Sequence, residues 1–206
     1  MASYSFTNPA TYHLLRSVIS PPPPHRAPSN TPPSYGTLLG STLFQSFISG
    51  VVAFRVLPRP QFSTLQKHTF PVYFTLQTLT PLALLLTYPS GASRLLPALS
   101  STRVTQSPTD SLSLWLVGTM FFTALANLVY VGPKTTEVMR VRKHQETRDG
   151  KAAYDKGPHS EEMQRLNRQF SVLHGISSLT NLVGLGAMVW YGAVLGSGLR
   201  LEHVAL

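Results

Sequence analysis

A row of polar side chains lies in the last long apolar segment of the chain, within the sequence "HGISSLTN". The row consists of His174, Ser177, Ser178 and Asn181. These residues are three or four positions apart, so a helix would bring them onto one face. Histidine is ionisable, and an ionisable side chain inside an apolar segment is a candidate for function. Hydroxyl and amide groups on the same face could bind a polar solute or join neighbouring helices by hydrogen bonds.

Shorter polar rows mark the other three apolar segments, at the spacing of a helix. They are Ser41, Gln45 and Ser49 in the first, Gln77 one turn from Pro81 in the second, and Thr119, Thr123 and Asn127 in the third. We expect the rows to converge in one polar seam. Its members are Gln45, Ser49, Gln77, Thr123, Asn127, His174, Ser177, Ser178 and Asn181. Small residues at Gly36/Gly40, Ser46/Gly50 and Gly192/Gly196 predict close approach of helices.

Two interpretations of the polar seam stay open. In the first, its groups form hydrogen bonds between helices, each worth on average about 0.6 kcal/mol in a membrane. In the second, they line a path for a transported solute. The lining residues would then be Gln45, Asn127, His174 and Asn181. Because four short helices enclose little volume, this second interpretation predicts a homo-oligomer.

Motifs for catalysis or metal binding are absent from the sequence. The chain has no cysteine, and none of its seven histidines lies three or four residues from another. This spacing excludes a zinc site built from neighbouring residues. The sequence also lacks a GxSxG motif, a glycine-rich phosphate loop and a close pair of carboxylates inside an apolar segment. We expect no catalytic residue, no metal site, no cofactor and no enzymatic activity.

Long stretches without charge indicate the elements that carry the seam. Only 12% of the 206 residues are charged, about half the share of a soluble domain. Four stretches contain no Lys, Arg, Asp or Glu, namely 27–54, 68–93, 111–133 and 169–199. A bilayer core about 30 Å thick is crossed by about 20 helical residues. The sequence therefore predicts an all-α, four-helix transmembrane bundle in a lipid bilayer, with spans of about 36–57, 69–88, 111–131 and 172–195.

A polar interruption at residues 58–67 separates the first two spans. Pro58 and Pro60 cannot continue the first helix. Arg59 and Lys67 suit the water interface, and Arg55 lies within one turn of it. Several aromatic residues fit the interfacial belt, namely Phe62, Phe70, Tyr73 and Phe74. We therefore expect a tight hairpin at 58–67.

The distribution of Lys and Arg predicts the orientation in the membrane. Four spans place 58–67 and 132–171 on one side, which carries 12 of the 17 basic residues when Arg55 is included. The positive-inside rule puts this side in the cytosol and both termini outside or in a lumen. The charged loop 132–171 mixes nine basic with six acidic residues and has no platform for stacking bases, so we expect no nucleic-acid partner. Its candidates for contact with lipid head groups are Arg140, Arg142 and Lys143.

Residues 1–35 form a separate head with 8 of the 17 prolines. We expect this head to be disordered and residues 36–200 to form the membrane domain. Its sequence "PPSY" (32–35) matches a motif that WW domains bind. The weakly amphipathic "ATYHLLRSVIS" (10–20) leaves a mitochondrial location open beside the endomembranes and the plasma membrane, which we favour.

Three blocks of the chain resemble the transmembrane protein 205-like family, which consists of small multi-pass membrane proteins with a domain of unknown function. The blocks are "SFISGVVAFRVLPRPQFSTLQKHTFPVYF" (46–74), "ANLVYVGPKTTEVM" (126–139) and "RLNRQFSVLHGISSLTNL" (165–182). The matched positions of the first block include the hairpin residues Arg55, Pro58, Arg59, Phe62, Gln66, Phe70, Pro71 and Tyr73. The resemblance implies a four-helix membrane domain and a connection with drug resistance and vesicular trafficking, but no settled biochemical activity. The chain departs from the animal members in lacking their intramembrane cysteines.

Together these features favour a non-enzymatic, multi-pass integral membrane protein with a structural, adaptor or trafficking role. The alternative is a small oligomeric transporter or channel that uses the polar seam as its path. The sequence does not reveal a protein partner or a transported substrate.

Overall fold

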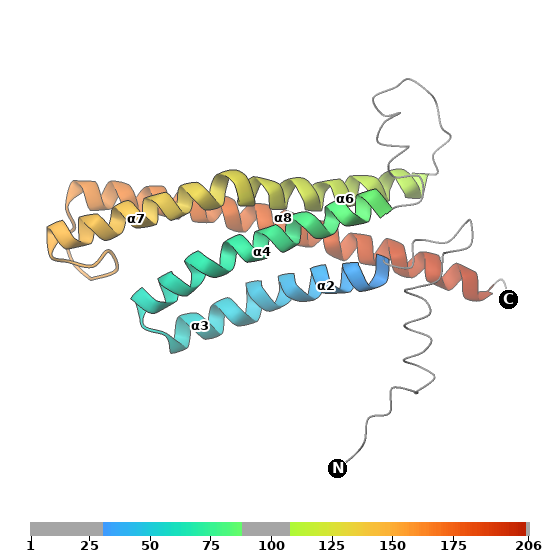
Figure 1. Cartoon of the computed structure of the whole chain (residues 1–206), viewed down its shortest axis with the longest axis horizontal. Coiled ribbons are helices and arrows are strands. Elements are labelled where there is room, and N and C mark those ends of the chain that lie inside the picture. Colours follow the sequence, from blue (N-terminus) through green and yellow to red (C-terminus); the bar gives the residue numbers. More distant parts are fainter. Residues whose placement is uncertain (1–30, 88–107, 205–206) are drawn as a thin grey trace, which may run out of the picture.

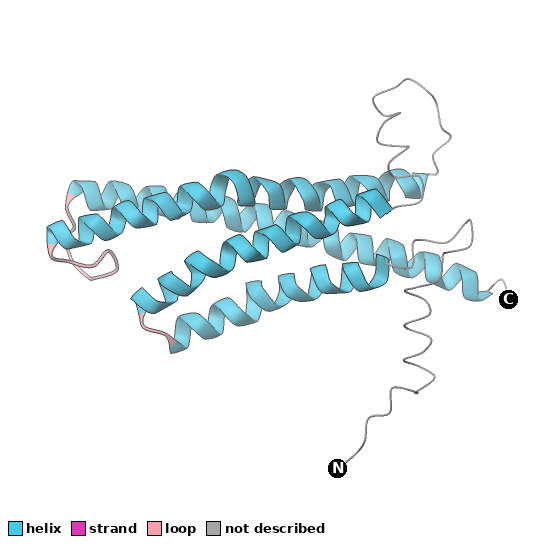
Figure 2. Cartoon of the chain, in the orientation of Figure 1, coloured by secondary structure: helices cyan, strands magenta, loops and turns pink. Residues whose placement is uncertain are grey.

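The structure is a computed structural model that describes residues 31–87 and 108–204. Its elements are α2 (Thr31–Leu43), η1 (Phe44–Ser49), α3 (Gly50–Val56), α4 (Arg59–Thr87), α6 (Pro108–Ala126), η2 (Asn127–Val131), α7 (Gly132–Asp149) and α8 (Glu161–Val204) (Figure 1). The described residues form helices and connecting turns without a strand, which confirms the predicted all-α class (Figure 2). Four helical segments are long and apolar enough to cross a membrane: Pro33–Val56, Arg59–Leu86, Ser111–Asp149 and Glu161–Gly196.

The helices pack as four rods, since α2, η1 and α3 follow one another and α6 continues through η2 into α7. Helix α4 packs against both α2 and α6, and α8 runs along α6 and α7 and also contacts α2 (Figure 1). The centre of the core consists of Leu38, Leu84, Val117, Met120, Ala187, Met188 and Tyr191. Large apolar side chains also cover the outside, for example Trp115, which is 77% exposed. A soluble protein rarely exposes so much apolar surface, and lipid would cover it.

The first connection is shorter than the hairpin predicted at 58–67. Helix α3 ends at Val56, Leu57 is extended (φ −93°, ψ 142°), and α4 already begins at Arg59. A residue before proline avoids the helical conformation, so Pro58 ends the first rod as expected. Pro60 does not delay the next helix, because proline fits the first turn, where its missing N–H has no partner to lose. The predicted turn is therefore mostly helix, and the second span starts about ten residues earlier than expected.

The predicted charged loop 132–171 is instead a helical hairpin. Helix α7 ends at Asp149, its cap Gly150 has a φ of 61° that suits glycine, and α8 begins at Glu161. Ser160 caps the start of α8, because its hydroxyl accepts a hydrogen bond of 3.2 Å from the Met163 amide. Charge does not prevent helix formation, since Arg, Lys, Glu and Gln are good helix formers in water. Ion pairs one turn apart, Lys143–Glu146 and Arg165–Glu162, support the two helices.

The predicted proline-rich head falls mostly outside the described residues, which begin at 31. Residues 31–35 differ from the prediction because they form the first turns of α2. The tyrosine of the PPSY sequence, Tyr35, packs within the bundle. Its hydroxyl donates a 3.0 Å hydrogen bond to the Met188 carbonyl, and its ring lies edge-on to Tyr191. This contact occupies the side chain that a WW domain would bind.

The α3–α4 turn and the α7–α8 turn lie at the same end of the bundle (Figure 1), as the predicted topology requires. Because the chain has no cysteine, single cysteines can test its orientation without background labelling. We expect Gln61→Cys and Lys156→Cys to react with a membrane-impermeant maleimide only from the cytosolic side. Gly36→Cys, near the opposite end, should react only from the other side. Labelling of positions 61 and 156 from different sides would contradict the fold, and a complete reversal would contradict the orientation alone.

Candidate functional site

A chain of hydrogen bonds between side chains begins at Gln77 in the middle of α4. The Gln77 side chain is 2% exposed, and its amide nitrogen lies 2.8 Å from Thr42 Oγ1 and 2.7 Å from the Tyr73 hydroxyl. Both acceptors are also buried, Thr42 on α2 and Tyr73 one turn before Gln77. A primary amide has two N–H donors, so these two contacts use both of them. Gln77 therefore ties α4 to α2.

The same chain continues from Tyr73 to α8. The Tyr73 hydroxyl donates to Asn181 Oδ1 at 3.2 Å, and Asn181 Nδ2 donates to Ser46 Oγ at 3.2 Å. Thr42, Gln77, Tyr73, Asn181 and Ser46 thus form one connected set, which we call the polar chain. It joins α2, η1, α4 and α8. Its donors and acceptors are matched to one another in the interior, where an unmatched polar group would be costly.

The polar chain contains only two residues of the predicted seam, Gln77 and Asn181. In the first rod the inward row is Leu38, Thr42 and Ser46, which lies beside the expected row of Ser41, Gln45 and Ser49. Gln45 and Ser49 are half-buried, and neither forms a side-chain hydrogen bond in the part of the chain that the structure describes. Tyr73, expected in the interfacial belt, turns out to be the central link. The four-residue spacing of Tyr73 and Gln77 was the signal that could have found it.

Asn127 forms a second contact between helices, one turn of α8 away from the polar chain. It is 1% exposed, and its Nδ2 donates to the Ser177 carbonyl at 3.4 Å, so Ser177 contributes its backbone rather than its hydroxyl. Within the described residues, Asn127 Oδ1 has no hydrogen-bond partner. Thr123 is one turn earlier, and its hydroxyl donates to the carbonyls of Thr119 and Met120 in its own helix. Asn127 therefore joins the α6–η2 rod to α8 through its amide nitrogen, while its amide oxygen has no partner among the described residues.

Asn127 also begins η2, a segment of π-helix. The Gly132 amide donates to the Asn127 carbonyl, five residues back instead of four. A methyl group on Gly132 would lie 2.6 Å from that carbonyl oxygen, closer than real contacts allow. Short π-turns inside α-helices are frequent at functional sites, because the extra residue rotates the side chains that follow. Here the turn separates the membrane part, α6, from the charged part, α7.

His174 and Ser178 remain outside both sets of hydrogen bonds. Both side chains are exposed, although Asn181, on the same face of α8, is covered by α4 and η1. The His174 ring stacks on Phe170 one turn earlier, with centroids 5.7 Å apart and planes 6° apart. The structure thus places Asn181, at one end of the predicted α8 row, against the other helices. It leaves His174 and Ser178, nearer the other end, uncovered. One of the three predicted small-residue contacts is also open, since nothing lies within 4 Å of the position of a Cβ on Gly36 or Gly40.

Aromatic rings hold the α3–α4 turn together. The Arg59 guanidinium lies 3.7 Å from the centre of the Phe54 ring, which meets Phe62 edge-on at 5.4 Å. Further along α4, Phe70 contacts Tyr73 and Phe74. Gln66 faces Gly50 of α3, and the Pro71 carbonyl accepts a hydrogen bond from Thr75. Arg55 is exposed near the turn, as expected for a side chain that reaches water. These contacts give most of the predicted hairpin residues a structural role.

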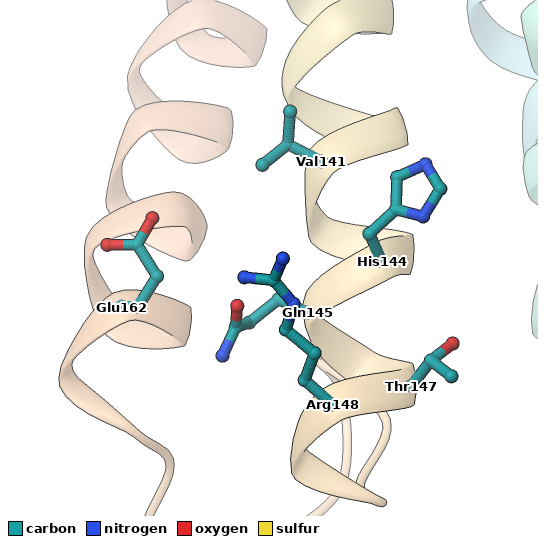
Figure 3. Close-up of a pocket in the computed structure, with 6 residues that line it drawn as sticks. All are labelled: Val141, His144, Gln145, Thr147, Arg148 and Glu162. Carbon is teal, nitrogen blue, oxygen red and sulfur yellow. The ribbon is translucent and has the colours of Figure 1, made fainter.

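The α7–α8 hairpin carries an open pocket of about 670 Å³. Its lining residues are Val141, His144, Gln145, Thr147 and Arg148 of α7 and Glu162 of α8 (Figure 3). Gln145 and Arg148 point into the space between the two helices, while His144 and Thr147 point away from Glu162 (Figure 3). Among the described residues, no three His, Cys, Asp or Glu side chains are placed to hold a metal ion. The pocket is therefore a mixed-charge surface suited to a polar partner.

Comparison with known proteins gives matches to a family model and to curated proteins. The family model described as "Domain of unknown function (DUF4149)" matches residues 34–144, from the start of α2 into α7. The chain is also similar to "Xanthocillin biosynthesis cluster protein D" of Aspergillus fumigatus, with 32% identity over 166 residues. This alignment covers 81% of the chain and 86% of the relative. No solved structure matches the chain.

Proposed function

The chain belongs to the family of the domain of unknown function DUF4149, and we propose that it acts as a non-enzymatic membrane scaffold or adaptor. In this role the four apolar helices anchor the protein, and the α7–α8 hairpin offers a charged surface to partner proteins in the cytosol. We place it in an endomembrane or the plasma membrane. The resemblance to the transmembrane protein 205-like family supports a role in trafficking.

The polar chain is the observation that carries this proposal. Its amides and hydroxyls are hydrogen-bonded to one another across three rods. Gln77 has both N–H donors occupied. Groups that bind a passing solute need free donors or acceptors, whereas groups that hold helices together do not. The interior of the single chain is thus better suited to rigidity than to conduction.

The length of the helices also supports a surface role. At about 1.5 Å per residue, the 44 residues of α8 extend about 66 Å, roughly twice the bilayer core. The α7–α8 end reaches beyond the α3–α4 turn (Figure 1). The name of the Aspergillus fumigatus relative associates that protein with a biosynthesis cluster. A scaffold that gathers partners at a membrane fits such a setting without itself doing chemistry.

Photo-crosslinking in native membranes tests the scaffold role. A photoreactive amino acid in place of Arg148, at the pocket between α7 and α8, should give discrete adducts with other proteins. The same amino acid in place of Trp115, on the lipid-facing side of α6, serves as the matched control and should give none of these adducts. If position 148 gives no protein adduct beyond those of position 115, the scaffold proposal fails.

A small oligomeric transporter is the second candidate, and two observations favour it. His174 and Ser178 are uncovered in the single chain, and Asn127 Oδ1 is buried without a partner in the described structure. In an oligomer these groups could face a shared path. This path would use Gln45, Asn127, His174 and Asn181, as the sequence suggested.

Reconstitution into liposomes separates the two candidates. The scaffold predicts no protein-dependent flux of protons, measured with entrapped pyranine, and none of a panel of small polar solutes. The transporter predicts flux that falls at least tenfold in both His174→Ala and Asn181→Ala. His68→Ala, an exposed histidine near the start of α4, is the control and should retain the flux. Flux of this kind would replace the scaffold proposal.

A further inference from the structure

Three side chains from the two helices of the charged hairpin meet where the hairpin joins the membrane part. The Arg142 guanidinium carbon of α7 lies 4.5 Å from the centre of the Phe170 ring of α8. The His174 ring stacks on the same Phe170 ring at 5.7 Å. A guanidinium and an imidazole are thus held against one aromatic ring, and neither belongs to the polar chain or to the pocket of Figure 3.

The Arg142 guanidinium has no direct acidic partner among the described residues, although the charge of Glu146 acts on it from one turn away. The side chain is half-buried, its Nε is buried without a hydrogen-bond partner, and it forms no ion pair among the described residues. The acid one turn further along α7, Glu146, has both carboxylate oxygens engaged elsewhere. One accepts from Lys143 Nζ at 2.8 Å and the other from the Ala153 amide at 3.0 Å. A partly buried guanidinium with an unpaired donor favours the binding of an anion from outside the protein.

The position of Phe170 along the membrane normal indicates which anion is near. Asn127 contacts Ser177, so these residues lie at the same depth. Seven residues of α8 place Phe170 about 10 Å toward the cytosolic end, whereas Tyr130 is only about 5 Å in that direction along η2. Tyr130 is exposed beneath Lys134, an arrangement typical of the membrane interface. The Phe170 ring therefore lies in the head-group layer, which extends about 5–7 Å beyond the hydrocarbon core.

The surface of α8 on the membrane side of His174 is suited to an acyl chain. Gly175 and Ser178 are exposed, and nothing lies within 4 Å of the position of a Cβ on Gly175. Leu182, one turn further into the membrane, is 59% exposed. If a molecule placed its phosphate at Arg142 and His174, its acyl chain would thus lie along this exposed, partly apolar surface of α8.

We propose that Arg142 and His174, held against Phe170, bind the phosphate of a phospholipid in the cytosolic leaflet. The planar guanidinium suits two phosphate oxygens, and the imidazole can donate to another. Phe170 keeps both groups in place by cation–π contact and stacking. This site goes beyond the scaffold role and does not depend on it. Of the three residues predicted to contact lipid head groups, this site uses only Arg142. Arg140 and Lys143 are exposed, and Lys143 already pairs with Glu146.

Native mass spectrometry of the full chain in a phosphate-free detergent tests the site, with dioctanoyl phosphatidic acid as the probe. We expect saturable binding of one molecule, weakened at least tenfold in Arg142→Gln and several-fold in His174→Gln. Arg142→Lys, which keeps the charge but loses the planar fork, should have an intermediate affinity. Arg140→Gln is the matched control, since it removes an exposed charge two residues away on a different face of α7, and its affinity should be unchanged. The thermal unfolding temperature without lipid should be similar in all variants, which separates lost binding from lost folding.

Two further probes identify the source of the phosphate. Dioctanoyl glycerol, which has the tails without the phosphate, should bind at least tenfold more weakly than the phosphatidic acid. Inorganic phosphate should compete with the lipid only at concentrations far above those of the lipid. Equal loss of binding in Arg140→Gln and Arg142→Gln, equal binding of dioctanoyl glycerol, or equal affinity for inorganic phosphate would each overturn the proposal.

Discussion

Replacing Gly132 with alanine should lower the free energy of unfolding by about 2 kcal/mol, the range in which overpacking of a tight site falls. The added methyl group would lie 2.6 Å from the Asn127 backbone carbonyl oxygen, and backbone atoms cannot rotate away as a side chain can. To relieve this contact, the helix must lose the π-turn of η2 or distort around it. Unfolding by increasing denaturing detergent in mixed micelles, followed by far-UV circular dichroism, measures the change.

The matched control for this prediction is Gly118→Ala in the preceding helix. Gly118 also lies inside a membrane segment, but nothing is within 4 Å of the position its methyl group would take. Alanine is the better helix former, so this variant should be as stable as the parent or slightly more so. Equal stability of Gly132→Ala and Gly118→Ala would show that the π-turn is not required by the fold.

The π-turn also determines how α7 is rotated relative to α6. A conversion to regular α-helix would remove one residue from the turn and rotate α7 by about 100° relative to α6. Arg142 would then leave the Phe170 ring, which it now contacts at 4.5 Å. We therefore expect Gly132→Ala to weaken binding of dioctanoyl phosphatidic acid as well, even under conditions in which the variant stays folded. Native mass spectrometry of this variant beside Gly118→Ala checks the result.

The number of spans could be predicted from composition, but their ends could not. A span needs only a charge-free stretch of about 20 residues, and four such stretches are visible in the sequence. The end of such a stretch marks the edge of the membrane, not the end of the helix. Backbone hydrogen bonds continue into water, so α6 runs on into α7 and α4 begins at Arg59. The proline after Leu57 ended a helix where the sequence indicated.

The inward faces were harder to predict, because polar residues occupy more than one row of a helix. In the first rod, Thr42 and Ser46 lie beside Ser41 and Gln45, and only contacts with other helices decide which row is covered. The π-turns η1 and η2 also change which side chains face the other helices, because each inserts a residue into the helical period. His174 shares a face with Asn181, yet the neighbouring rods leave it uncovered.

Tyr73→Phe should lower the free energy of unfolding by about 2 kcal/mol, although it removes a single oxygen atom. The Tyr73 hydroxyl accepts from Gln77 at 2.7 Å and donates to Asn181 at 3.2 Å, so its loss leaves two groups of the polar chain without this partner. An unmatched buried donor or acceptor costs about 1–3 kcal/mol, more than the mean value of a bond between membrane helices. The same denaturing-detergent titration measures the change.

A double-mutant cycle with Gln77→Leu shows whether the polar chain acts as a unit. Once Gln77 is replaced by an apolar residue of similar size, Tyr73→Phe leaves only the Asn181 group unmatched, so it should cost about half as much as in the parent. Tyr130→Phe, which removes an exposed hydroxyl from η2, is the control and should change the stability by less than about 0.5 kcal/mol. A small effect of Tyr73→Phe, equal to that of Tyr130→Phe, would mean that the interior groups are solvated rather than bonded to one another. That result would favour the polar path over the scaffold, because only a hydrated interior can accept a solute in place of its own partners.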